Sequence, residues 1–485
     1  MITKEETDNV KPIVAFKSFR ERLHEQFHKR ADALINLLDG LCGNHNARSA
    51  VEVSLEPTFE RQYGSLHDAV DNFFTASSPQ RAATQRHQEA MERTALITEF
   101  LPAPSQRPFW LFGIDTTPAL RPFAAKLSDR GVVYHPNPAP GNRPIGVGHT
   151  YSVLAWLPER KAGEAPWVVP LSCERVPTST TDQAVAAGQV AGLLDNAQLP
   201  FADALTVEVV DSAYSRARYL HAVGGYPNHI VVARLAGNRT LYRIAPEDGP
   251  SRRGHPRWHG TPFTLDDERT WGAPVETLQW EWQTSRGRPL RIVLQRWNDL
   301  LMNGKRDVPM HTHPFDVIRG RVFDDEGHLV FKRSLWLMVM GEHRREIGVR
   351  PCYEAYRQRF DLEHFFRFGK NHLLMDRYQT AEIEHEENWW ELACLAYILL
   401  WLAAPLAAAV PRPWERFLPT LNNRPIPGPA QVQRDFGRII RQFGTPAQSP
   451  ERRGKSPGRA KGWSPGVRPR QPVVFKNRSP PQKAA

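Results

Sequence analysis

The sequence predicts an α/β fold, in which helices flank a mixed β-sheet. Two observations support this class: apolar runs of strand length alternate with helical periods between residues 109 and 235, and two-residue alternation dominates residues 278–340. The length of 485 residues favours two to four domains, and 41% hydrophobic and 24% charged residues are typical of globular proteins. We expect an N-terminal helical domain (1–105), a core in two parts (106–240 and 346–443), a β-rich insertion between them (241–345) and a basic disordered tail (444–485).

The first 105 residues are predicted to be mainly helical. Phe19, Leu23 and Phe27 follow one another at helical spacing, and residues 80–101 form another helical pattern. No clear helix-turn-helix pattern is present in this part of the sequence.

The order of elements in the core is informative. The expected strands are 109–115, 148–157, 167–172, 205–211 and 229–235, and the expected helices are 178–196 and about 216–223. Three strands, a helix, a strand, a helix and a strand is the order of an RNase H-like sheet. That order makes the first and fourth strands neighbours at the centre of the sheet.

Each of these two strands delivers a carboxylate at its end. Asp115 ends the first apolar run and precedes a predicted turn, and Asp211 ends the fourth run. Taken singly, either aspartate could be a helix cap or a loop anchor. His149 belongs to the same sheet, where we expect an ordinary strand residue with satisfied hydrogen bonds rather than a catalytic group.

A later amphipathic helix, residues 356–370, carries a third carboxylate. Its polar side chains recur at steps of three and four residues and share one face: Tyr356, Arg359, Glu363, Arg367 and Lys370. The apolar residues between 362 and 373 form a second stripe that packs the helix onto the rest of the protein. Alternatively, the polar face is a solvated surface with ordinary charge pairs.

Three carboxylates at one place raise one another's pKa unless a cation lies between them. Hard oxygen ligands favour Mg²⁺ or Mn²⁺. Two such ions, about 3.5–4 Å apart, can activate the attacking oxygen and stabilise the leaving oxygen in phosphoryl transfer. Basic residues on the same helix face would then hold a phosphodiester backbone.

The spacing of the helix residues resembles a known signature. Tyr356, Arg359, Glu363 and Lys370 match the Y-R-E-K pattern of cut-and-paste DDE transposases from bacterial insertion sequences. In that family the glutamate completes a triad with two strand-borne aspartates of an RNase H-like fold. The resemblance covers roughly residues 109–375 and implies the triad Asp115, Asp211 and Glu363, with two Mg²⁺ or Mn²⁺ ions.

The charge of the chain favours a polyanionic partner. The net charge is +11, and after residue 450 ten Lys and Arg residues face one acid. The resemblance implies that this partner is double-stranded DNA, both at the element ends and at the target. It also implies that a homodimer binds this DNA. The N-terminal helices would bind the ends, or else be a structural appendage. Residues 141–148 lack the Lys-Ser/Thr ending of a phosphate loop, so we expect no nucleotide cofactor.

The β-rich insertion is expected to contain a hairpin around residues 285–288 and strands at 317–323, 329–331 and 335–340. Its basic and aromatic residues could contact DNA or simply pack: Arg252, Arg253, Arg257, Trp258 and Trp297. His311 and His313 form an H-x-H pair, but no third ligand is suitably spaced, so a metal site is disfavoured.

The rest of the chain fits a cytoplasmic protein associated with the nucleoid. Residues 392–410 are apolar enough to approach a membrane span, but Pro405 and the acidic residues before them favour a core helix. Residues 411–429 are irregular, and 431–443 form a helix. The polar N-terminus is no secretory signal, and the four cysteines are expected to be reduced.

Three functions remain open. The first is a transposase, in which strand cleavage is followed by attack of the freed 3′-hydroxyl on target DNA. The second is an RNase H-like nuclease that only hydrolyses. The third is a DNA-binding descendant that has lost the chemistry.

Overall fold

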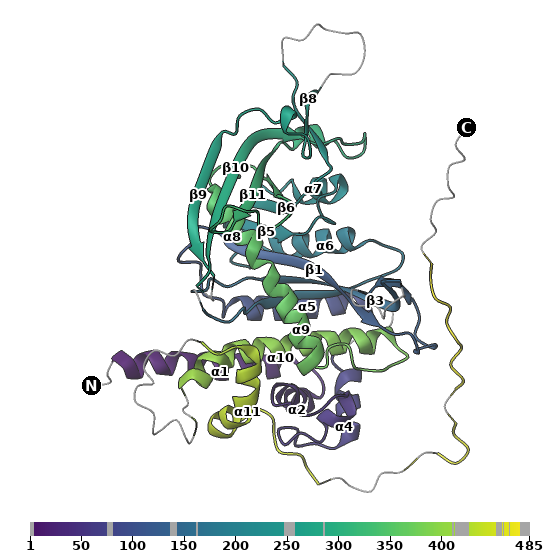
Figure 1. Cartoon of the computed structure of the whole chain (residues 1–485). Helices are drawn as coiled ribbons and strands as arrows, with labels where there is room; N and C mark the ends of the chain where they lie inside the picture. The colour runs from purple at the N-terminus through teal and green to yellow at the C-terminus, as the bar shows by residue number, and fades with distance from the viewer. Residues whose placement is uncertain are drawn as a thin grey trace.

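The computed structural model describes residues 4–74, 81–135, 143–161, 163–246, 258–284, 287–409, 412, 426–452, 458, 460–464 and 466–475. In these residues twelve strands form one sheet, with helices packed around it (Figure 1). The strands are β1 (Trp110–Leu120), β2 (Gly131–Tyr134), β3 (Ile145–Trp156), β4 (Val169–Val176), β5 (Thr206–Val210), β6 (His229–Arg234), β7 (Thr240–Ile244), β8 (His259–Thr264), β9 (Glu276–Gln283), β10 (Pro289–Leu301), β11 (Phe315–Phe323) and β12 (Leu335–Met340). The helices are α1 (Lys4–Gln26), α2 (Ala31–Cys42), α3 (Ala50–Val53), α4 (Tyr63–Asp71), α5 (Ala82–Thr98), α6 (Asp182–Leu194), α7 (Ala217–Val223), α8 (Val349–Gln358), α9 (Phe360–His372), α10 (Ile383–Ala409) and α11 (Pro429–Phe443).

The central part of the sheet confirms the predicted RNase H-like arrangement. Strands β4, β3 and β1 are antiparallel neighbours, and β5 and β6 continue the sheet parallel to β1. Helix α6 makes the crossover from β4 to β5. It begins after Thr181, whose hydroxyl accepts a hydrogen bond from the Ala184 amide, so one free amide of the first turn is satisfied.

The β-rich segment extends the same sheet. Strand β12 pairs with β6, and β11, β10, β7 and β8 follow. The predicted hairpin is present as β9 and β10. The strand predicted at 329–331 is wrong: in the described residues only one isolated bridge forms after the turn at Asp324, between Phe323 and Leu329. Residues 329–331 are exposed, so no packing holds them in a ladder.

Strand β1 is longer than predicted. The turn expected directly after Asp115 is wrong, because β1 continues to Leu120 and pairs with β3 throughout. The Arg121 amide donates a hydrogen bond to the Val147 carbonyl of β3, and the Leu111 carbonyl accepts one from Leu157, just after β3. Since alternate residues of a strand face the same neighbour, the nitrogen of Pro118 faces away from β3, and the proline is tolerated. On the other side β5 has already ended, so no ladder bond is lost.

The N-terminal segment is helical, as predicted, and shares its core with the C-terminal helices. In Figure 1, α10 lies between the sheet and the helices α2, α4 and α11. The ring of Phe16 meets that of Phe436 edge-on at 6.3 Å, and Cys42 Sγ donates a hydrogen bond to the Ala396 carbonyl. By length and composition α10 could cross a membrane, but 72% of its apolar window is buried inside the protein, as the predicted core helix requires.

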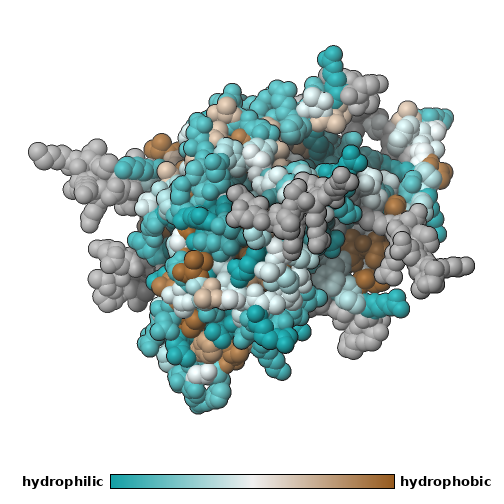
Figure 2. Space-filling view, turned by 90° about the horizontal axis from the view of Figure 1, so that it is seen from above, coloured by the Kyte–Doolittle hydropathy of each residue, from teal (hydrophilic) through white to brown (hydrophobic). Residues whose placement is uncertain are grey.

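The described part of the tail differs from the predicted disorder. The Val474 amide donates to the Arg130 carbonyl (2.7 Å), which places residues 471–474 beside the edge strand β2. The face seen in Figure 2 is mostly hydrophilic, with scattered hydrophobic patches. All four cysteines are free and buried. Arg252, Arg253, Arg257 and most of residues 411–429 lie outside the described residues.

Candidate functional site

The register of two parallel strands brings Asp115 and Asp211 together. Phe112 pairs with Glu208 and Gly113 with Val209. Two residues further along, this register sets Asp211 opposite Asp115. Neighbouring strands lie about 4.8 Å apart, and paired side chains point to the same face of a sheet. The register therefore brings the two aspartates to neighbouring positions at the end of β5, where the charge of Asp211 acts on Asp115.

Glu363 lies on α9, which packs on β1 and brings this glutamate close to Asp115. The absence of a side chain at Gly113 makes room for Leu362, whose Cδ1 would lie 2.8 Å from a Cβ at that position. The single helix predicted for residues 356–370 is wrong. It breaks at Arg359, where α8 ends and α9 begins, and the backbone bonds there span three residues instead of four.

Arg359 lies among the three carboxylates. Its Nη1 donates a hydrogen bond to Asp115 Oδ2 (2.7 Å), and its Nη2 is 3.5 Å from Glu363 Oε1. The charge of Asp211 also acts on Arg359. Asp211 is further held by its own loop, because its Oδ1 accepts a hydrogen bond from the Ala213 amide (2.7 Å).

Burial is the main reason why the pKa of Asp115 is raised. Burial raises the pKa of Asp115 to about 6, Arg359 opposes this shift, and the charges of Asp211 and Glu363 add to it. For Arg359, burial lowers the pKa, but the surrounding carboxylates raise it by more. Three acids against one arginine leave two negative charges when all are ionised, which a divalent cation would compensate.

The other residues of the signature occupy different environments. Tyr356 is buried, with its ring 5.9 Å from the Arg359 guanidinium, and Arg367 is exposed. Lys370 Nζ donates a hydrogen bond to the Pro118 carbonyl (2.6 Å) on β1, and burial lowers its pKa to about 8. Thus Arg367 faces solvent, whereas Lys370 is hydrogen-bonded to the sheet.

The chemical type of the three side chains suits a hard divalent cation. Asp115, Asp211 and Glu363 offer carboxylate oxygens, the ligands that Mg²⁺ and Mn²⁺ prefer. Within the described residues, no three such side chains are gathered tightly enough to hold an ion by themselves. Mg²⁺ usually binds through one or two carboxylates and substrate phosphates, so a complete cage is not required before DNA binds.

Two neighbours of the site were missed from the sequence. Val210 pairs with Ala233, so Arg234 follows in the row of Asp115 and Asp211, and it is exposed. Tyr214 is buried, and after burial the charge of Asp115 contributes most to its raised pKa. Aligning the ends of the fourth and fifth predicted strands could have found Arg234, whereas no sequence signal marks Tyr214.

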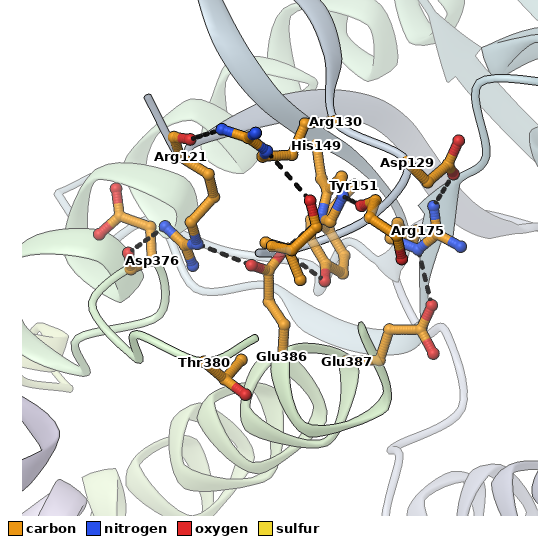
Figure 3. A network of polar contacts seen from close by, with 12 residues as sticks. Arg121, Asp129, Arg130, His149, Tyr151, Arg175, Asp376, Thr380, Glu386 and Glu387 are labelled. Atoms are coloured by element: carbon orange, nitrogen blue, oxygen red, sulfur yellow. Dashed lines mark hydrogen bonds and ion pairs between the residues drawn. The ribbon is translucent and has the colours of Figure 1, made fainter. Parts of the chain in front are cut away.

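His149 belongs to a structural network (Figure 3). Its Nδ1 is 2.8 Å from Glu386 Oε1, and its Nε2 is 3.0 Å from the Ser128 carbonyl. Glu386 also accepts hydrogen bonds from Arg121 Nε (2.6 Å) and the Tyr151 hydroxyl (3.0 Å). These contacts bind β3 and the loop after β1 to α10, as expected for a histidine with satisfied hydrogen bonds.

The aromatic and histidine candidates of the insertion are packed together. Trp297 is buried beside Trp271 and Trp336, so base stacking by Trp297 is wrong and its hydrophobic packing is confirmed. The His311 ring stacks on Trp258 at 3.7 Å. His313 Nε2 lies 3.1 Å from Nδ1 of His221. In the described chain no third metal ligand joins these two histidines.

The fold and the site together define an RNase H-like protein with an acidic centre on its sheet. A family model described as DDE superfamily endonuclease matches residues 22–291, more than half of the chain, and the protein therefore belongs to that family. The match includes Asp115 and Asp211 and ends before Glu363. The family implies a DNA substrate and generally uses divalent metals. A comparison with curated proteins gave no match.

Proposed function

We propose that this DDE endonuclease is a transposase, which cleaves DNA at the ends of an insertion sequence and joins the freed strand to a target. Asp115, Asp211 and Glu363 would hold two Mg²⁺ or Mn²⁺ ions when DNA is bound. When bound, these ions supply activation of the attacking oxygen and stabilisation of the leaving oxygen. Water and the freed 3′-hydroxyl serve in turn as nucleophiles in the same in-line transfer.

The basic residues of α9 and of the junction before it position the DNA. Arg359 exchanges Asp115 for a backbone phosphate, which its planar guanidinium can bind through two hydrogen bonds. Arg367 is exposed on α9 and contacts a neighbouring phosphate. Tyr356 packs beside the Arg359 guanidinium and limits its movement. Lys370 contacts the backbone once it leaves the Pro118 carbonyl.

One observation carries this proposal: three acidic groups that are far apart along the chain surround a single arginine. Arg359 contacts Asp115 and Glu363 directly, and the charge of Asp211 acts on both Asp115 and Arg359. Ordinary surface ion pairs do not gather carboxylates in this way, because the mutual repulsion costs stability. A site that binds cations and phosphates accounts for the arrangement.

The assembly follows from the reaction. Joining two element ends to one target requires two active sites, so the DNA-bound protein is a homodimer. The N-terminal helices, residues 1–105, bind the element ends. The net charge of +11 supports extensive contact with DNA.

The test uses Glu363→Gln, which removes the charge and keeps the shape of the side chain. The variant and the wild type are incubated with Mg²⁺ and DNA that carries the sequences flanking the coding region, and cleaved and joined strands are measured separately. The variant should bind this DNA but neither cleave nor join it. Glu354→Gln is the matched control, because Glu354 is exposed on the neighbouring helix and pairs only with Arg350 in the described structure.

Two results would overturn the proposal. Joining by Glu363→Gln at the wild-type rate would remove Glu363 from the site. Cleavage without any joined product by the wild type would make the protein a nuclease that only hydrolyses.

A further inference from the structure

Two loops each bring an arginine to the β6 side of Asp211. Arg216 directly precedes α7, and Arg239 lies in the loop between β6 and β7. Nη1 of Arg239 donates a hydrogen bond to the carbonyl oxygen of Ser215 (2.6 Å). Since Ser215 is the residue before Arg216, the Arg239 guanidinium is fixed at the backbone next to Arg216.

The two arginines lack acidic partners. Among the described residues, neither Arg216 nor Arg239 forms an ion pair with a carboxylate. Burial lowers the pKa of Arg239, and the positive charge of Arg216 lowers it further. Arg218, two residues along, differs, because its Nη2 lies 3.8 Å from Asp307 Oδ2. Two like charges at one position are stabilised when an anion binds between them.

The pair lies one short loop from the acidic centre. Asp211 accepts hydrogen bonds from two amides of the loop that leads to Arg216, those of Ala213 (to Oδ1, 2.7 Å) and Tyr214 (to the backbone carbonyl, 3.3 Å). On the opposite side of Asp211, α9 packs on β1, and Arg359 lies at the junction that precedes this helix. A strand that crosses the carboxylates therefore meets basic groups on both sides.

We infer that Arg216 and Arg239 form a second phosphate-binding site, which holds the backbone of a DNA strand on the β6 side of Asp211. This inference rests on the proposed function, since it places the same DNA. The guanidinium of Arg239 uses one nitrogen for Ser215 and offers its other donors to phosphate oxygens. Arg216, exposed beside it, adds the second positive charge.

The test measures the binding of a short labelled DNA duplex, in EDTA, over a range of salt concentrations. Arg216→Ala should weaken binding about tenfold and reduce the slope of log affinity against log salt by about 1, because one phosphate contact is lost. Arg218→Ala is the matched control, as an exposed arginine of the same helix that already has an acidic partner. Its slope should equal that of the wild type.

Arg239→Lys provides a second variant, which keeps the charge but cannot bind a phosphate through two hydrogen bonds. It should weaken binding less than Arg216→Ala, with a wild-type melting temperature. Equal slopes for wild type, Arg216→Ala and Arg218→Ala would overturn the inference. Cleavage of the same duplex in Mg²⁺ tests the proposed function separately: a wild type that cleaves DNA, with no effect of Arg216→Ala on binding, would disprove only the second site.

Discussion

The Asp115 carboxyl group lies between one cation and two further acids. Arg359 binds it at 2.7 Å, yet burial and the charges of Asp211 and Glu363 raise its pKa to about 6. Ionisation of Asp115 therefore costs free energy in the folded protein that it does not cost in the unfolded chain. Such a cost is expected where a group is kept for its chemistry.

This environment predicts an unusual pH dependence. Between the unfolded value near 4 and about 6, the folded protein binds more protons than the unfolded chain, so the contribution of Asp115 to stability falls as pH rises through that window. In Asp115→Asn this loss is absent. Without metal, the variant should match the wild type near pH 4 and exceed it by about 1–2 kcal/mol near pH 8, a discounted value for a partly exposed group, in urea unfolding.

Asp129→Asn is the control with the opposite sign. Burial raises the pKa of Asp129, but hydrogen bonds from Thr178 and Arg175 lower it by more. This variant should lose stability at pH 8, and the loss should shrink as the medium becomes more acidic. If Asp115→Asn instead loses stability at pH 8, burial and the neighbouring carboxylates do not disfavour the ionised form of Asp115.

Single residues show where sequence reasoning reaches its limit. Asp115 and Asp211 could be predicted as neighbours, because apolar runs and strand order fix the register of parallel strands. The partner of Lys370 could not, since its contact with the Pro118 carbonyl depends on the unpredicted extension of β1. Whether an arginine faces solvent or a buried carboxylate depends likewise on tertiary packing.

At the scale of elements, the distance between α9 and β1 decides where Glu363 lies. Leu362 is fully buried against Gly113, with no space left for a side chain there. The sequence predicted both elements, but it did not predict the break at Arg359. Arg359 itself has helical backbone angles (φ −51°, ψ −32°). It is neither proline nor glycine, so its residue type gives no sign of a break.

Gly113→Val should push α9 away from β1 and separate Glu363 from Asp115. Overpacking of this kind costs about 1–3 kcal/mol in unfolding free energy, and a displacement of about 1 Å at a catalytic group can cost 100-fold in rate. We therefore expect a folded variant whose Mg²⁺-dependent DNA cleavage is reduced by at least tenfold. Gly188→Ala, at a position with open space around it on α6, should change neither quantity.

The loss should be recovered in part when Leu362 is shortened. In Gly113→Val with Leu362→Ala, the space for the new side chain is restored, and cleavage should rise above that of the single variant. Normal cleavage by Gly113→Val alone would show that the position of α9 does not control the site.

At the scale of the molecule, Glu386 connects the sheet to the helical layer. It is fully buried on α10 and binds Arg121 on the loop after β1 and His149 on β3 (Figure 3). Burial raises the pKa of Glu386, but His149 and Arg121 lower it by more. The ionised carboxylate thus holds the two layers together.

Glu386→Gln should destabilise the protein by about 3 kcal/mol, because it leaves Arg121 buried without a charged partner. Urea unfolding at neutral pH measures the loss. Glu387→Gln, in which the altered side chain is partly exposed and binds Arg175, should cost clearly less. Equal losses for the two variants would contradict a central structural role of Glu386.

The whole molecule was less predictable than its core. The RNase H-like strand order and the buried α10 followed from patterns in the sequence, because burial imposes its own periodicity. The joining of β12 to β6 and the placement of Val474 beside β2 did not, since both are long-range pairings of strand edges. The residues of an edge strand do not indicate which distant strand will pair with it.

The central claim is that Asp115, Asp211 and Glu363 share divalent cations in the presence of DNA. Binding of Mn²⁺ to the protein–DNA complex, followed by electron paramagnetic resonance, tests it directly. Asp115→Asn and Glu363→Gln should each weaken Mn²⁺ binding by at least about tenfold, since even the loss of an outer-shell partner of a metal ligand commonly costs about 10–100-fold in affinity. Glu354→Gln, at an exposed glutamate that pairs with Arg350, should leave it unchanged. Wild-type Mn²⁺ binding by both carboxylate variants would contradict the claim.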